Sequence, residues 1–244
     1  LLGKKYYEPH PVTENSFGKN YGEHRDFLEF SFEQHLKLIN FANKCGIKYA
    51  TSVWEKKSAM QFIRIQKNLD YLKVPSACNL DFELLGILAD KFKKKIHVSL
   101  GMTKKREIDR IIMFFKKKRR SKDLIVYHCC SAYPSKFEDL NLLNISLLKK
   151  KYKNLISEVA FSGHHLGISA DIAAYTLGAN TIERHFTLDR TFKGTDHAAS
   201  LEPEGLKKLS RDLRSVSSSL KENLSNEITK SEAPVRKKLK IFRA

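Results

Sequence analysis

Cysteine, long apolar stretches and leader signals are scarce or absent in this 244-residue sequence. Its four cysteines, Cys45, Cys78, Cys129 and Cys130, form no C-x-x-C pair, which excludes a zinc ribbon and a disulfide framework and predicts reduced thiols. No run of eighteen apolar residues occurs, so we expect no membrane-spanning helix. No basic-then-apolar leader marks a signal peptide. A cytoplasmic location is the resulting expectation.

Positive charge is in large excess, whereas the apolar content is ordinary. Forty-five Lys and Arg residues against 27 Asp and Glu residues give a formal charge of +18. A hydrophobic fraction of 41% suffices for one sizeable core and excludes whole-chain disorder. Basic runs such as Lys116–Arg120 are dispersed, without stacking aromatics between them. This pattern favours a solvated surface that steers anionic substrates over a nucleic-acid-binding face.

Short β-branched or apolar runs alternate with longer amphipathic stretches. Six strands are predicted, with starts roughly 22 to 35 residues apart, the length of a strand-plus-helix unit: Ile47–Val53, Tyr71–Val74, Ile96–Leu100, Leu124–His128, Val159–Ser162 and Thr181–Phe186. Regular βα repetition predicts an α/β fold of the TIM (β/α)8 barrel type, with six βα units visible in this chain. We expect an N-terminal loop segment over 1–30, the barrel catalytic domain over 31–220 and a basic C-terminal tail over 221–244.

Several helix ends are marked by local signals. Ser31 and Gln34 have the spacing of a capping box, and Gly46 is placed to end that helix. Thr103 is predicted to cap the helix that follows it. Pro203 is typical of a first helical turn.

Polar side chains follow the predicted strands where a parallel barrel has its active site. Hydroxyl groups and one lysine at these strand ends suit a phosphate-bearing substrate, because they donate hydrogen bonds to its oxygens. A serine that closes a strand is also ordinary turn chemistry, so each serine alone is weak evidence. The candidates are Ser52, Lys73, Ser76, Ser99, Ser131 and Ser162.

Two histidines end neighbouring strands. His164 ends the fifth predicted strand and His185 the sixth, and neighbouring strands lie roughly 4.8 Å apart. Two imidazoles so placed can bind one metal ion with open positions for water and substrate. The alternative for each is a hydrogen-bonded loop histidine. Asp196 follows Gly194, which lets the loop turn back, so its carboxylate either accepts hydrogen bonds from a sugar or serves as a turn or helix cap.

Six segments, in this order along the chain, share one pattern. They are KVPSA (73–77), SLGM (99–102), HCCSAYP (128–134), FSGHHLGISADIAAYTLGA (161–179), IERHFTLDR (182–190) and GTDHAASLEP (194–203). The chain from about Tyr21 to Arg214 thereby resembles the N-acetylneuraminate (sialic acid) synthases.

The resemblance implies a TIM-barrel transferase that condenses phosphoenolpyruvate with N-acetylmannosamine or a related 2-acetamido sugar and releases phosphate. It implies a divalent metal, Mn²⁺ with Mg²⁺ or Co²⁺ as alternatives, that polarises the sugar aldehyde. It also implies a homodimer without nucleic-acid or membrane partners. By motif, His164 and His185 would bind the metal and act in catalysis with Lys73. Tyr133 and Asp196 would contact the sugar, and phosphoenolpyruvate would be bound by Ser52, Ser76, Ser99, Ser131 and Ser162.

This sequence departs from the family pattern in places. Gly163 stands where the family often has Asp, Ser131 where some members have Asn, and Cys78 where some have an acidic residue. The departures suggest a subfamily with a different sugar. The resemblance also implies that two family strands are missing before Leu1, and that the family's C-terminal antifreeze-like domain is missing.

Alternatives remain open at this point. The missing strands motivate a non-catalytic degenerate barrel that binds ligand or a partner chain, because an open sheet edge must be covered. The charge leaves a nucleic-acid-associated protein as a further possibility. Related barrels join phosphoenolpyruvate to phosphorylated sugars. The exact sugar and the metal stay open.

Overall fold

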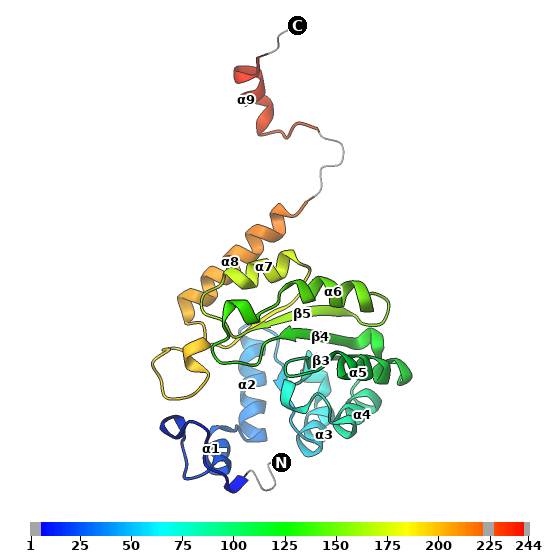
Figure 1. Cartoon of the computed structure of the whole chain (residues 1–244), viewed down its shortest axis with the longest axis vertical. Helices are drawn as coiled ribbons and strands as arrows, with labels where there is room; N and C mark the ends of the chain where they lie inside the picture. Colours follow the sequence, from blue (N-terminus) through cyan, green and yellow to red (C-terminus); the bar gives the residue numbers. More distant parts are fainter. Residues whose placement is uncertain (1–5, 222–226, 242–244) are drawn as a thin grey trace.

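The computed structural model describes residues 6–221 and 227–241. Its centre is a six-stranded parallel sheet that curls into a half-barrel, with the strands side by side in chain order (Figure 1). The strands are β1 (Thr51–Ser52), β2 (Tyr71–Val74), β3 (Lys95–Ser99), β4 (Leu124–Cys129), β5 (Glu158–Gly163) and β6 (Ile182–Arg184). All six predicted strands are therefore confirmed, although the first and the last are shorter than expected. The half-barrel confirms the predicted α/β class, and closure into eight strands stays a prediction.

Helices alternate with the strands and cover the outer face of the sheet. Helix α2 (Phe32–Lys44) precedes β1. The helices that follow β1 to β6 in turn are α3 (Lys56–Arg64), α4 (Phe82–Lys91), α5 (Lys105–Lys117), α6 (Leu143–Tyr152), α7 (Ser169–Thr176) and α8 (Pro203–Ser219). This order puts the carboxyl ends of all six parallel strands at one rim of the half-barrel.

Most of the predicted helix signals are confirmed. The Ser31 hydroxyl accepts from the Gln34 N–H while the Gln34 side chain accepts from the Ser31 N–H, as a capping box requires. Pro203 opens α8. The prediction for Thr103 is wrong, because α5 begins two residues later and the Thr103 hydroxyl donates to the Gly101 carbonyl instead.

The N-terminal segment differs from the predicted loop. It contains helix α1 (Tyr21–Leu28), whose first turn is capped by the Asn20 side chain accepting from the Glu23 N–H. Nearby glycines and charges hid this local signal. In the described part of the tail, helix α9 (Glu232–Leu239) lies apart from the half-barrel with all its residues exposed (Figure 1).

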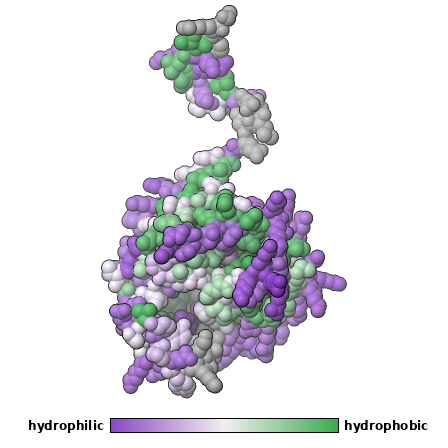
Figure 2. All heavy atoms as spheres, in the orientation of Figure 1, coloured by the Kyte–Doolittle hydropathy of each residue, from purple (hydrophilic) through white to green (hydrophobic). Residues whose placement is uncertain are grey.

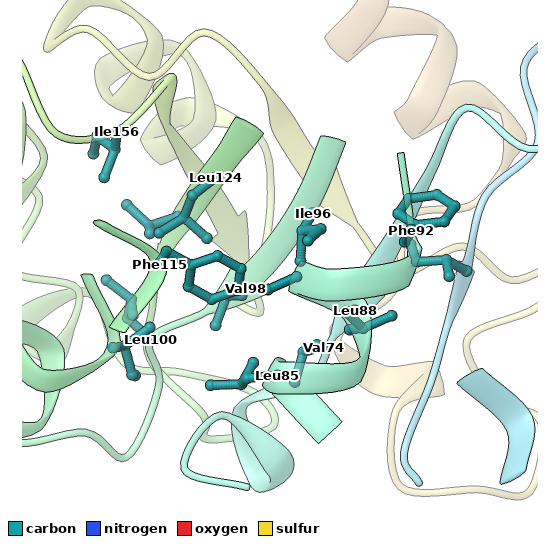
Figure 3. Close-up of a cluster of buried hydrophobic side chains, with 14 of the residues drawn as sticks. Val74, Leu85, Leu88, Phe92, Ile96, Val98, Leu100, Phe115, Leu124 and Ile156 are labelled. Carbon is teal, nitrogen blue, oxygen red and sulfur yellow. The ribbon is translucent and has the colours of Figure 1, made fainter. Parts of the chain in front are cut away.

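The main core lies between the sheet and its covering helices. Figure 3 shows strand residues such as Val98 and Leu124 among Leu85, Leu88 and Phe115 of the helices, all fully buried. These strand residues alternate with side chains that face the inside of the half-barrel, as the two-residue period of a strand requires. A smaller inner cluster contains Ile125, Tyr127 and Ala160. The inner face becomes polar toward the carboxyl ends of the strands.

Hydrophilic side chains cover much of the face shown in Figure 2. That distribution fits the lysine-rich surface expected from the sequence. Among the described residues, no helix combines the length and apolar character needed to cross a bilayer.

Candidate active site

An ion pair lies inside the half-barrel between its second and last strands. The Lys73 ammonium donates to Glu183 Oε1 at 2.7 Å, and the Ser162 hydroxyl donates to the same oxygen at 2.7 Å. Burial alone would raise the pKa of Glu183. The Lys73 charge and the hydrogen bonds from Lys73 and Ser162 outweigh it, so the pKa is lowered and the carboxylate is ionised at neutral pH. The pair therefore holds an oriented ammonium group at the rim.

The two predicted metal-binding histidines meet at the same rim. The ring centroids of His164 and His185 are 5.2 Å apart, and the Tyr133 ring lies 4.2 Å from His164 and 5.7 Å from His185. Asp196 Oδ2 is 3.6 Å from His185 Nδ1. The structure thus brings together four of the predicted site residues, Tyr133, Asp196 and both histidines.

The histidine pair fits a divalent metal by its donor chemistry. His164 Nδ1 donates to the Cys130 carbonyl at 2.7 Å, which leaves Nε2 as the ring acceptor. Burial lowers the pKa of His164 to about 4, so the ring is neutral at pH 7, as a metal ligand must be. No group of three His, Cys, Asp or Glu side chains suited to a metal occurs among the described residues.

A second polar cluster lies where β2, β3 and β4 end. Cys129 Sγ lies 3.4 Å from Ser76 Oγ and 3.7 Å from Ser131 Oγ, and the Gly101 N–H donates to Ser76 Oγ at 3.1 Å. A Cβ at Gly101 would overlap Ser131 Oγ, Ser76 Oγ and Cys129 Sγ. We call these four residues the polar cradle. Glycine is required here because the three side chains occupy the space that a methyl group would need.

Ser99 adds an unpartnered hydroxyl to this region. It ends β3 on the inner face, two residues after His97, whose ring stacks on Tyr71. Ser99 is buried, and its hydroxyl has no hydrogen-bond partner among the described residues. A buried hydroxyl of this kind is available to a bound anion.

Ser52 is separated from the other candidates. It pairs with Lys73 in the sheet register, but it is exposed on the edge strand and lines a cavity of about 370 Å³ beside the N-terminal segment. A larger cavity of about 1100 Å³ lies between α5 and α6, and Ser131 is the only predicted site residue that lines it. The other predicted site residues lie outside that cavity, although Cys129 of the polar cradle also lines it.

Sequence reasoning missed Glu183 and the contact of Cys129 with the serines. A signal for Glu183 was present, because it lies two residues before His185 and must face the same side of β6. Its partner Lys73 is 110 residues away, so only the folded chain shows the pair.

Comparisons with known proteins show what the whole chain is similar to. The family model that matches residues 3–225 is that of the NeuB family. The human N-acetylneuraminate-9-phosphate synthase is 36% identical over 219 residues, covering 90% of this chain and 59% of that protein. The N,N'-diacetyllegionaminic acid synthase of Campylobacter jejuni is 33% identical over 206 residues, covering 84% and 60%. The chain therefore spans less than two thirds of the length of these relatives.

A solved structure supports the same relationship. The crystal structure of N-acetylneuraminic acid (sialic acid) synthetase from Leptospira borgpetersenii superposes with a TM-score of 0.78 at 29% identity. The match covers 91% of this chain and 75% of that one.

Proposed function

Because the chain belongs to the NeuB family, we propose that it is a synthase that joins phosphoenolpyruvate to a 2-acetamido sugar and releases phosphate. The observation that carries the proposal is the meeting of the Lys73–Glu183 pair with the His164–His185 pair at one rim. The first pair offers a cation to an anionic substrate, and the second offers two imidazole rings.

The residues at the rim divide between the two substrates. We assign Lys73, Ser162 and the unpartnered Ser99 to phosphoenolpyruvate, with the serines of the polar cradle, because these groups donate hydrogen bonds to phosphate and carboxylate oxygens. Tyr133 and Asp196 border the histidine pair and are assigned to the sugar. Ser52 is the outermost candidate for the same anion.

The proposed reaction forms one carbon–carbon bond. C3 of phosphoenolpyruvate attacks the aldehyde carbon of the open-chain sugar, and water adds to C2. The resulting tetrahedral carbon expels phosphate by C–O cleavage. A divalent ion, Mn²⁺ by preference, would be held by His164 and His185 and would polarise the aldehyde oxygen. Lys73 offsets negative charge on the phosphate and carboxylate, and Glu183 keeps its ammonium group in place.

The names of two relatives supply two sugar classes to test. Phosphoenolpyruvate contributes three carbons, so C6 of the sugar becomes C9 of the product. A 9-phosphate product, as in the name of the human relative, requires a sugar 6-phosphate. The name of the Campylobacter relative carries no phosphate. We therefore propose N-acetylmannosamine 6-phosphate and N-acetylmannosamine as the first sugars to compare.

The test is phosphate release from phosphoenolpyruvate in the presence of Mn²⁺ and either sugar. We expect release that requires both substrates and stops in excess chelator. Calorimetry with phosphoenolpyruvate alone separates the main alternative. Binding without turnover on either sugar would favour a non-catalytic barrel. Full activity in excess chelator would contradict the metal assignment.

A further inference from the structure

A buried charged cluster lies directly behind the histidine pair, on the outer face of the sheet. Arg184 Nη1 donates to Asp171 Oδ2 at 2.5 Å, and His165 Nε2 lies 3.4 Å from the same oxygen. The side chains of Asp171 and His165 are completely buried, and that of Arg184 is 2% exposed. The proposed chemistry of the inner face uses none of these three side chains.

The cluster is attached to both histidines through the backbone. Arg184 immediately precedes His185, and His165 immediately follows His164. Because side chains alternate along a strand, the outward Arg184 fixes the strand end from which His185 faces inward. The register pairs Arg184 with Gly163, which places the two strand ends next to each other.

The Arg184 guanidinium also connects the two segments that follow β5 and β6. It donates to the Gly167 carbonyl at 2.8 Å, to the His165 carbonyl at 2.7 Å and to the Ala199 carbonyl at 3.3 Å. The first two belong to the loop that follows His164, and the third lies three residues after Asp196. A planar fork of fixed geometry therefore sets where the ends of β5 and β6 lie relative to each other.

Gly163 leaves the space that this cluster fills. A Cβ at Gly163 would lie 2.9 Å from His165 Cε1 and 3.0 Å from Asp171 Oδ1. The glycine therefore allows the carboxylate from α7 to reach the back of the strand end.

Fold stability is a poor explanation for the cluster. Three of its buried polar atoms, His165 Nδ1, Asp171 Oδ1 and Arg184 Nε, have no hydrogen-bond partner among the described residues. A buried ion pair with incomplete hydrogen bonding is often no more stable than an apolar replacement of equal volume. Its position behind both histidines indicates a role in the geometry of the site rather than in the stability of the fold.

We propose that Asp171 and Arg184 are positioning residues that hold His164 and His185 at the separation needed to bind one divalent ion. This inference rests on the proposed function, because it takes the histidine pair as the metal site. Neither residue touches the substrates in this arrangement. Their effect is on the geometry of the ligands, in the way that residues surrounding a metal site orient its ligands.

The test measures Mn²⁺ affinity rather than turnover. The amplitude of the free Mn²⁺ signal in electron paramagnetic resonance gives the Kd for the wild-type protein, for Asp171→Asn and for Arg184→Lys. We expect both variants to raise the Kd at least about ten-fold. Should Asp171→Asn fail to fold, Arg184→Lys carries the test, since it keeps a positive charge facing Asp171 but loses the fork.

The chain offers a matched control at the opposite end of the strands. Arg120 donates to Asp123 and to the carbonyls of Ala89, Phe92 and Lys94. Arg120→Lys removes a similar fork far from the rim. We expect it to lower the Tm while leaving the Kd for Mn²⁺ unchanged.

A second readout needs no metal. The ¹⁵N chemical shifts of the imidazoles report whether His164 keeps its Nδ1–H tautomer. We expect Asp171→Asn and Arg184→Lys to populate the other tautomer as well. If Asp171→Asn and Arg184→Lys both bind Mn²⁺ with the wild-type Kd, the positioning role is overturned and the proposed function is left intact. Absence of Mn²⁺ binding by the wild-type protein would overturn the metal assignment and this inference together.

Discussion

The Lys73–Glu183 pair makes the clearest quantitative prediction. Glu183→Gln keeps the size of the side chain and an oxygen that accepts from Lys73 and Ser162, but it removes the charge. The two side chains are 15% and 25% exposed. Breaking a fully buried pair costs about 3–5 kcal/mol, and an exposed pair is worth about 0–1 kcal/mol. We expect the free energy of unfolding at pH 7 to fall by about 2 kcal/mol, between these limits.

The pH dependence of that loss follows from the pKa of Glu183, which is lower in the folded protein than its ordinary value of 4.5. A carboxyl group of this kind adds stability above its unfolded-state pKa, and this stability is lost as the pH falls through the folded-state pKa. The wild-type protein should therefore exceed the variant by about 2 kcal/mol at neutral pH, and this difference should shrink as the pH falls below 4.5.

Urea denaturation at a series of pH values measures both numbers. The control is Glu83→Gln, because Glu83 pairs with Lys56 at the surface, where the side chains are 69% and 64% exposed. That variant should change stability by less than about 1 kcal/mol at every pH. Parallel stability curves for the wild-type protein and Glu183→Gln from pH 3 to pH 8 would refute an ionised, lysine-paired Glu183.

Three further predictions concern the rim. His185→Ala should abolish Mn²⁺ binding and phosphate release, because one of two imidazole ligands is lost; full release would contradict the metal site. Gly101→Ala should raise the KM for phosphoenolpyruvate at least about ten-fold, because its methyl group displaces the polar cradle; an unchanged KM would argue against an anion there. Iodoacetamide should alkylate Cys129 more slowly when phosphoenolpyruvate is bound, whereas the exposed Cys45 should react at the same rate; peptide mass spectrometry measures both rates, and equal labelling of Cys129 in either condition would place the substrate elsewhere.

Local signals explain what the sequence predicted well. Strands such as Tyr71–Val74 consist of outward apolar residues between polar neighbours, and the capping box at Ser31 lies within four residues. The strand ends then indicated His164 and His185, because parallel strands end at one rim. The error at Thr103 has a cause that the sequence does not show, since its hydroxyl donates to the Gly101 carbonyl and accepts from the Asn79 side chain, 24 residues away, instead of capping α5.

Contacts between distant residues explain what the sequence did not predict. Glu183 meets Lys73 only because the sheet curls, since in a flat sheet of the same strand order three strands would separate β2 from β6. The ion pair of Asp171 with Arg184 joins α7 to β6. The two residues are 13 positions apart, so no local sequence pattern indicates that they pair. From the sequence alone, charged residues such as Asp171 and Arg184 are expected on the surface, and only the folded structure shows that they are buried.

The register of β6 links the inner site to the outer cluster. Glu183 and His185 face inward and Arg184 faces outward, and a shift of one residue would exchange these sides. It would place a guanidinium beside Lys73 and remove an imidazole from the rim. Two contacts oppose that shift: the ion pair of Arg184 with the buried Asp171, and the bridge between Phe186 and Leu201 just beyond the strand. The buried charges thus make the wrong register costly, because it would leave Asp171 buried without its cation. A strand of three residues has few backbone hydrogen bonds to specify its register, and here the side chains on its two faces provide that specification.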